Sequence, residues 1–131
     1  MKMVKILALS ALLSVGAAAD DTLALNMSQM ENGLSNVQKG FLYNAPALIK
    51  GGVSEIQKAN ALFHNVDASK KYLPKDKQHM GNIAFNAAKR IDAASGDLLV
   101  ALNKKEYTRA SQSYSEIVNA CTACHAVVRG W

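Results

Sequence analysis

Four stretches of the chain carry apolar residues at alternating steps of three and four, and this spacing constrains the fold more than any other feature. The stretches cover residues 27–41, 49–63, 80–101 and 107–128, with Asn60 as a polar gap in the second. Apolar residues at this spacing form one stripe along an α-helix. No alternation of apolar and polar residues is long enough for a strand. The sequence therefore predicts an all-α chain and argues against folds built from strand–helix–strand units.

Turn-forming and charged residues separate the four predicted helices. Glycine, asparagine and proline lie between 40 and 46, a polar stretch with Pro74 covers 67–77, and Asn-Lys-Lys covers 103–105. The pair Ser95-Gly96 inside the third stripe predicts a kink or an earlier helix end. Short connections between helices favour an antiparallel up-down-up-down four-helix bundle.

Such a bundle brings distant parts of the chain to the same end. The first helix begins where the fourth ends, and the connection between the second and third helices lies beside both. We therefore expect residues near 23–30, 63–80 and 121–131 to be neighbours, although they are far apart in the sequence.

Residues 1–19 have the pattern of a secretory signal peptide. Lys2 and Lys5 precede an apolar run of about ten residues, and small residues in an A-x-A pattern follow at 17–19. The apolar run is shorter than the roughly 20 residues that a membrane-spanning helix needs, so we expect no stable membrane insertion; an uncleaved anchor is the alternative. The prediction is export to the periplasm, cleavage near Ala19 and one mature domain over residues 20–131.

The charge balance excludes one class of partner. The 131 residues include 15 Lys and Arg against 10 Asp and Glu, and 50% of the residues are hydrophobic. Without residues 1–19 the counts become 13 and 10, so the net charge falls from +5 to +3. No run of basic residues with interleaved aromatics is typical of a nucleic-acid surface. The apolar content excludes a disordered chain, and two cysteines are too few for a disulfide-dense scaffold.

Both cysteines belong to the segment Cys121-Thr122-Ala123-Cys124-His125. C-x-x-C-H is the attachment signature of c-type haem, in which two thiols bond to the vinyl groups and the adjacent imidazole binds iron. Residues three and four apart share one face of a helix, so the two thiols and the imidazole can act together. The motif predicts one covalently attached haem c with its iron.

Three alternatives to covalent haem use the same residues. A disulfide between Cys121 and Cys124 would be strained inside a regular helix. A thioredoxin-like redox pair also uses C-x-x-C, but it needs a strand–helix–strand setting. Zinc could take both thiolates, His125 and a further histidine such as His64 or His79, but structural zinc ligands normally come as two separated pairs. We expect both of these other histidines at the surface, beside a loop.

The segment C-T-A-C-H-A-V-V-R, on the last helix of a short exported chain, resembles the cytochrome c prime family, the class II c-type cytochromes. The likeness is specific over residues 121–129 and architectural elsewhere. It implies that Cys121 and Cys124 carry the thioether bonds and that His125 is the proximal iron ligand. It also implies that Arg129 lies beside the haem; a charge that offsets the helix dipole is the alternative.

Two arrangements of the opposite side of the iron occur in this fold. An apolar residue leaves the iron open to small gases, whereas a methionine thioether favours electron transfer. The Asn26-Met27 pair resembles the first helix of the soluble haem-b four-helix cytochrome of the bacterial periplasm, whose axial methionine follows an asparagine. We expect Met27 as the distal ligand and Met30, Phe63 and Met80 as pocket walls. Met30 as the ligand, or methionines as ordinary core filler, are the alternatives.

These residues together predict an electron carrier rather than an enzyme. In this interpretation His125 and Met27 hold one low-spin haem, which passes single electrons through an exposed edge. The alternative is a five-coordinate protein that binds gases such as nitric oxide or carbon monoxide.

A cluster of lysines lies in the expected connection between the second and third helices: Lys70, Lys71, Lys75 and Lys77. The cluster predicts a docking patch that attracts an acidic redox partner, or charges that neutralise haem propionates. A solvated loop is the alternative. Trp131 is expected near the same surface, with no assigned role. Relatives often pair through their first two helices, which allows a homodimer, although no exposed apolar stripe requires one.

Overall fold

The computed structural model describes residues 18–131, all of whose regular elements are helical. The long helices are α1 (Ala18–Leu42), α2 (Pro46–Asn60), α4 (Gly81–Asn103) and α5 (Tyr107–Val128). Between α2 and α4 lie the 3-10 turn η1 (Ala61–Phe63), the short helix α3 (Val66–Lys70) and the 3-10 turn η2 (Lys75–Met80). The prediction of an all-α chain is confirmed for this range. The predicted leader lies outside the described residues, apart from the two alanines at which α1 begins.

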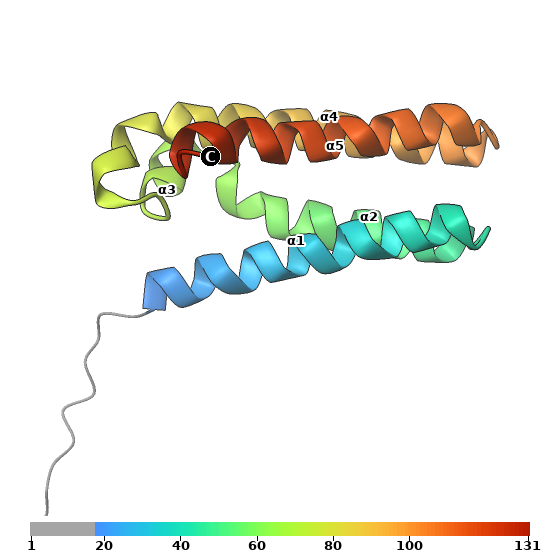
Figure 1. Ribbon diagram of the computed structural model, residues 1–131, viewed down its shortest axis with the longest axis horizontal. Helices are drawn as coiled ribbons and strands as arrows, with labels where there is room; N and C mark the ends of the chain where they lie inside the picture. The colour runs from blue at the N-terminus through green and yellow to red at the C-terminus, as the bar shows by residue number, and fades with distance from the viewer. Residues whose placement is uncertain (1–17) are drawn as a thin grey trace, which may run out of the picture.

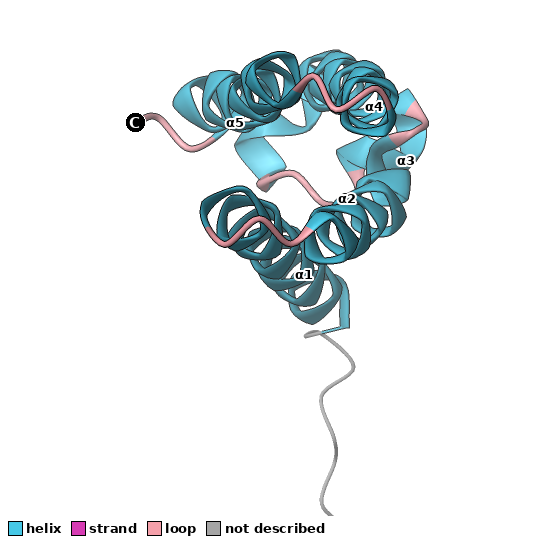
Figure 2. Cartoon of the chain, turned by 90° about the vertical axis from the view of Figure 1, so that its right-hand side faces the viewer, coloured by secondary structure: helices cyan, strands magenta, loops and turns pink. Residues whose placement is uncertain are grey.

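The four long helices form two antiparallel pairs, one of α1 with α2 and one of α4 with α5 (Figure 1). The view along the helices shows the two pairs facing each other (Figure 2). Helix α2 also contacts α4, whereas α1 and α5 barely touch. The arrangement is compatible with the predicted four-helix bundle. The start of α1, the short helix α3 and the C-terminus lie at the same end (Figure 1).

The connections follow the turn residues of the sequence with one addition. Asn44 takes a positive φ of 52° in the α1–α2 turn, and Pro46 opens α2, where its missing N–H costs nothing. Helix α3 lies in the stretch expected to be a loop. It begins where the Asn65 side chain accepts hydrogen bonds from the backbone N–H groups of Asp67 and Ala68, at 2.8 and 3.1 Å.

Helix α4 does not end at Ser95-Gly96, so the prediction of an earlier end is wrong. Ser95 is fully buried against the core, whereas a Cβ at Gly96 would meet open space. Tertiary packing around the neighbouring residues therefore outweighs the low helix propensity of one exposed glycine.

The apolar stripes meet in a core to which all four long helices contribute. Its largest fully buried apolar side chains are Val37, Ile49, Val53, Ile56, Leu98 and Ile117. Within this core α1 and α2 approach so closely that their backbones touch at two glycines. A Cβ on Gly33 would lie 2.7 Å from the Gly52 carbonyl oxygen, and a Cβ on Gly52 would lie 2.5 Å from that of Gly33. Only glycine fits at either position.

None of the helices in residues 18–131 combines the length and the apolar character needed to cross a bilayer.

Candidate cofactor site

A cavity of about 940 Å³ opens at the end of the bundle that holds the chain's C-terminus. Its volume lies near the upper end of the roughly 300–1,000 Å³ typical of cofactor sites. Helix α1 contributes Leu23, Ala24, Met27, Met30, Glu31 and Leu34. The segment from α2 to η2 contributes Asn60, Phe63, Tyr72, Leu73, Pro74, Asp76 and Lys77. Helix α4 contributes Ala84, Ala87, Ala88 and Ile91, and the end of the chain contributes Cys121, Cys124, His125, Val128, Arg129 and Gly130. The prediction that three distant segments become neighbours is confirmed.

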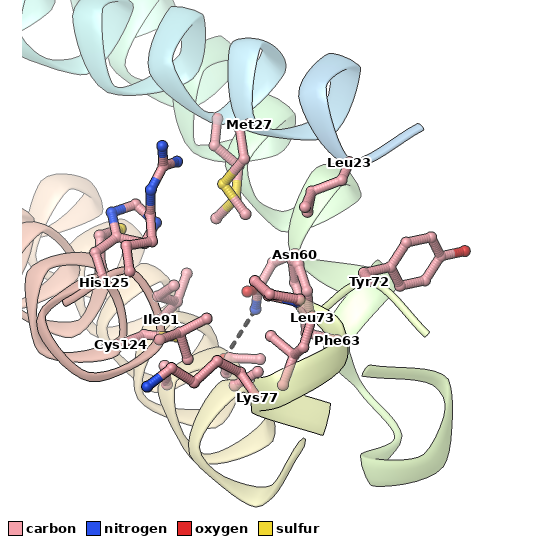
Figure 3. Close-up of a pocket in the computed structure, with 18 of the residues that line it drawn as sticks. Leu23, Met27, Asn60, Phe63, Tyr72, Leu73, Lys77, Ile91, Cys124 and His125 are labelled. Atoms are coloured by element: carbon pink, nitrogen blue, oxygen red, sulfur yellow. Dashed lines mark hydrogen bonds between the residues drawn. The ribbon is translucent and has the colours of Figure 1, made fainter. Parts of the chain in front are cut away.

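The two cysteines and the histidine of the C-x-x-C-H motif face this cavity from α5. Cys121 and Cys124 are free, half-buried thiols one helical turn apart. Figure 3 shows His125 beside Cys124. Burial raises the pKa of both thiols, and Cys124 raises that of Cys121 further. Burial also lowers the pKa of His125, and the positive charge of Arg129 lowers it again. The imidazole therefore tends to be neutral, which is the form that binds a metal ion.

The residues after the motif fold back over His125. The ring of Trp131 meets the imidazole edge-on, with 4.9 Å between ring centroids, although 72% of Trp131 remains exposed. The Arg129 guanidinium lies 5.5 Å from the Trp131 ring centroid, and the Arg129 backbone N–H donates to the His125 carbonyl at 2.8 Å. Arg129 thus lines the cavity, as expected, and Trp131 shields one side of the imidazole.

The predicted distal methionine lies across the cavity from the motif. Met27 projects from α1 into the space in front of His125 (Figure 3). One residue earlier, the Asn26 side-chain amide donates to the Ala59 carbonyl oxygen at 3.1 Å, which ties this part of α1 to the end of α2. Met30 lines the cavity one turn further along and is 6% exposed, so it belongs to the core as much as to the cavity.

Of the other predicted walls, one is in place and one is not. Phe63 is buried and lines the cavity. Met80 does not line it; its side chain packs behind the wall, in a cluster with Phe63, Leu73 and Val128. Met80 therefore stands next to the cavity-lining residues without lining the cavity itself. The η2 turn ends at Met80, and the first residue of α4 to reach the cavity is Ala84.

The two remaining histidines lie outside the cavity, as expected. His64 is about half exposed, and its Nε2 lies 2.6 Å from the Asp92 carboxylate. His79 is exposed on η2. Among the described residues, no three His, Cys, Asp or Glu side chains are grouped to hold a metal ion by themselves. Zinc bound by the motif and a second histidine therefore lacks its fourth ligand, and a thioredoxin-like site lacks its strands over residues 18–131.

The lysine cluster divides into two kinds of residue. Lys77 is half-buried and lines the cavity, so its ammonium group is available to an anion bound there (Figure 3). Lys70 lies 3.2 Å from Asp67 on its own helix, and Lys71 and Lys75 are exposed.

One residue of the cavity wall was not predicted as a site residue. Asn60 is fully buried, and its Nδ2 donates to the Ala88 carbonyl oxygen at 2.8 Å and to Asp92 Oδ1 at 2.9 Å. Its own Oδ1 is buried without a hydrogen-bond partner. The sequence carried one sign of this residue, the polar gap in the second apolar stripe.

Comparisons with protein-family models, with curated proteins and with solved structures found no match for this chain.

Proposed function

We propose that this chain is a monohaem c-type cytochrome of class II, built as an antiparallel four-helix bundle, that carries single electrons in the periplasm. One observation carries the proposal: the C-x-x-C-H motif of α5 and Met27 of α1 face each other across one cavity of cofactor size. No local feature of either helix requires this meeting.

The residues present fit the chemistry of a covalently held haem. Cys121 and Cys124, one turn apart, would bond the two vinyl groups, and the His125 imidazole and the Met27 thioether would hold the iron. The buried part of the wall is almost wholly apolar, as a flat aromatic macrocycle requires. Lys77 and Arg129 supply cations for the two propionates. When bound, haem supplies reversible one-electron chemistry at its iron.

Each of these side chains has a distinct part in the proposed function. Cys121 and Cys124 hold the group permanently, so the carrier does not lose it between partners. His125 offers a neutral nitrogen, because burial and Arg129 disfavour its proton. Met27 offers a soft thioether, which favours the reduced state and leaves no open position. Met30 fills the space behind it and excludes water.

The setting of the carrier belongs to the same proposal. The leader-like pattern of residues 1–19 supports export to the periplasm. Lys77 lines the cavity, and the exposed Lys71 and Lys75 lie on the same connecting segment; this positive charge suits a redox partner with an acidic surface. Electron transfer of this kind requires no substrate turnover, so the chain acts as a carrier and not as an enzyme.

Absorption spectra test the proposal directly. The full chain, expressed in a host that attaches c-type haem, should be red and should keep its colour through acid-acetone extraction. Replacement of both Cys121 and Cys124 by Ser should abolish this retention. A colourless wild-type protein, or a pigment extracted as easily from the wild type as from the double variant, would overturn the assignment of covalent haem.

A matched pair of methionine variants tests the carrier function. Met27→Leu should convert the low-spin spectrum to high spin and remove the methionine-to-iron charge-transfer band. Met30→Leu, one turn away on the same helix, should leave both unchanged. If the ferrous wild-type protein is already high-spin and binds carbon monoxide readily at neutral pH, the carrier role is wrong and a gas-binding role replaces it.

A further inference from the structure

The buried amide of Asn60 is the polar feature of the cavity that the proposed haem ligation does not use. Among the cavity-lining residues that are fully buried in the described part of the chain, Asn60 is the one polar side chain. Its Oδ1 has no partner, although burying an unpaired oxygen costs about 1–3 kcal/mol. Such an atom in a cavity wall points to an interaction with whatever fills the cavity.

The orientation of this amide is set by its neighbours. Both Nδ2 hydrogens are used, one by the Ala88 carbonyl oxygen at 2.8 Å and one by Asp92 Oδ1 at 2.9 Å. A flipped amide would direct its oxygen at these two acceptors and lose both hydrogen bonds. These two hydrogen bonds therefore fix which end of the amide is the oxygen, and this oxygen lies on the cavity side of the side chain, buried among its neighbours (Figure 3).

Asp92 is itself held in place by a contact with a residue at the surface. Its second oxygen lies 2.6 Å from Nε2 of His64, which is about half exposed. A chain of polar contacts thus runs from solvent through His64 and Asp92 to the amide of Asn60. Groups in such a chain polarise one another, so the carboxylate increases the negative partial charge on the amide oxygen.

A lone water molecule is a poor partner for this oxygen. A buried water normally makes two to four hydrogen bonds, and the other buried residues of the wall, such as Phe63, Leu73 and Ile91, have no polar side-chain atoms. The negative end of the amide dipole therefore faces the cofactor in an apolar environment that screens it weakly.

We propose that Asn60 sets the redox potential of the cofactor by holding its unpaired Oδ1 on the cavity side, with Asp92 as the positioning residue that orients and polarises it. The inference rests on the proposed haem function. A negative dipole stabilises the oxidised cofactor, which carries one more positive charge, so Asn60 lowers the midpoint potential. It opposes the thioether of Met27, which raises the potential.

Potentiometric titration of the haem-loaded full chain tests this role. Asn60→Leu keeps the number of side-chain heavy atoms and the branch at Cγ and removes the dipole. At a fixed solution potential the oxidised-to-reduced ratio should fall about tenfold, equivalent to a rise of ~59 mV for a one-electron couple. Asn60→Ala should shift the potential in the same direction and serves if Asn60→Leu does not fold. Ser95→Ala is the matched control, because Ser95 Oγ is also buried and unpaired but does not line the cavity; it should leave the potential unchanged.

A double-variant cycle separates the positioning role of Asp92 from the loss of its charge. Asp92→Ala should raise the potential in the wild type and should raise it much less in the Asn60→Leu background, because contacting residues that act through one another are not additive. In the cofactor-free chain, the side-chain amide protons of Asn60 should exchange slowly with solvent by NMR, and faster after Asp92→Ala. This second measurement does not depend on the haem.

The outcomes are distinct. A coloured protein whose potential responds equally to Asn60→Leu and Ser95→Ala overturns the inference and leaves the proposed function intact. Additive effects of the Asp92 and Asn60 substitutions overturn the positioning role. A protein without covalent haem overturns the proposed function, and this inference with it.

Discussion

Small residues border helix α1 on two of its faces, but they give close packing on one face and a cavity on the other. On the face toward α2, Gly33 and Gly52 let the two backbones touch, and a single added carbon would clash. On the face toward the α4–α5 pair, α4 also contributes small residues to the opposing wall, among them Ala87 and Ala88, yet a cavity of about 940 Å³ remains. Small side chains close one interface and leave the other open.

The difference comes from what holds the helices apart. Helices α1 and α2 are joined by a short turn and are free to approach until their atoms meet. Helix α1 and helix α5 belong to different pairs, each closed by its own core contacts, and η1, α3 and η2 lie between α2 and α4 at the cavity end. A small residue therefore gives close packing only where the backbone can follow.

The largest expected effect is a difference in unfolding free energy between substitutions at two adjacent residues of α1. Gly33→Val places a branched side chain against the Gly52 carbonyl oxygen, which cannot move without shifting α2, so we expect a loss of about 3 kcal/mol of unfolding free energy. Leu34→Phe directs its added atoms into the cavity and should cost less than about 1.5 kcal/mol. Urea unfolding of the cofactor-free protein measures both. Equal losses would mean that the α5 face is as closely packed as the α2 face.

A milder version of the same test uses two neighbouring glycines of α2. Gly52→Ala should destabilise the protein by about 1–3 kcal/mol, because its Cβ would lie 2.5 Å from the Gly33 carbonyl oxygen. Gly51→Ala meets no atom within 4 Å and should stabilise the helix by roughly 0.5–1 kcal/mol. Thermal unfolding of the two variants should therefore move in opposite directions. A shift of the same sign would contradict the backbone contact.

Filling the open side is the third test. Ala87→Leu adds apolar atoms to the cavity wall, so the cofactor-free chain should gain on the order of 1 kcal/mol while the fraction of chains that carry haem falls. Ala94→Leu lies two turns along the same stripe, inside the packed core and away from the cavity, and should instead cost about 1–3 kcal/mol. Unchanged haem content in Ala87→Leu would show that the cavity wall at α4 is not occupied by the cofactor.

The smallest expected effect is a change with pH in the closed part of the core. Burial raises the pKa of the Tyr114 hydroxyl above its ordinary value of 10.0, and Cys121 raises it further. The unfolded chain therefore loses this proton first, so the contribution of Tyr114 to stability is complete below pH 10 and is lost as the pH rises above it. Below pH 10 the difference in unfolding free energy between the wild type and Tyr114→Phe should be constant. Above pH 10 the wild type should lose stability relative to the variant.

Tyr43→Phe is the control for this measurement, because its ring is 76% exposed at the opposite end of α1 from the cavity. A pH dependence that is identical in the two variants would contradict the burial of Tyr114.

The helices themselves could be predicted because their signals are local. The apolar spacing of residues 27–41 or 107–128 needs only the geometry of one helix to be interpreted. Helix α3 was missed because five residues are too few to show a period, although Asn65 carried the capping signal at its start. The position of Met80 off the cavity wall was not visible either, because Met80 ends the η2 turn, which the sequence pattern did not show.

The two sides of the site differ in how far the sequence could predict them. The Cys121, Cys124 and His125 side chains had to share a face, since backbone hydrogen bonds within one helix fix the positions of residues three and four apart. Asn60 was visible only as a gap in a stripe. Its meaning depends on Ala88 and Asp92 of another helix, which use its amide hydrogens and leave its oxygen unpaired.

The sequence by itself therefore determined four helical segments, their turns and one cluster of two cysteines and a histidine on a single helix face. Only the tertiary structure decided that Met27 faces that cluster across a cavity, that Met80 does not, and that Gly33 and Gly52 bring two backbones into contact. The physical reason is the range of the forces involved. Backbone hydrogen bonding relates residues within one helix, whereas close packing between helices depends on every side chain that lies between them.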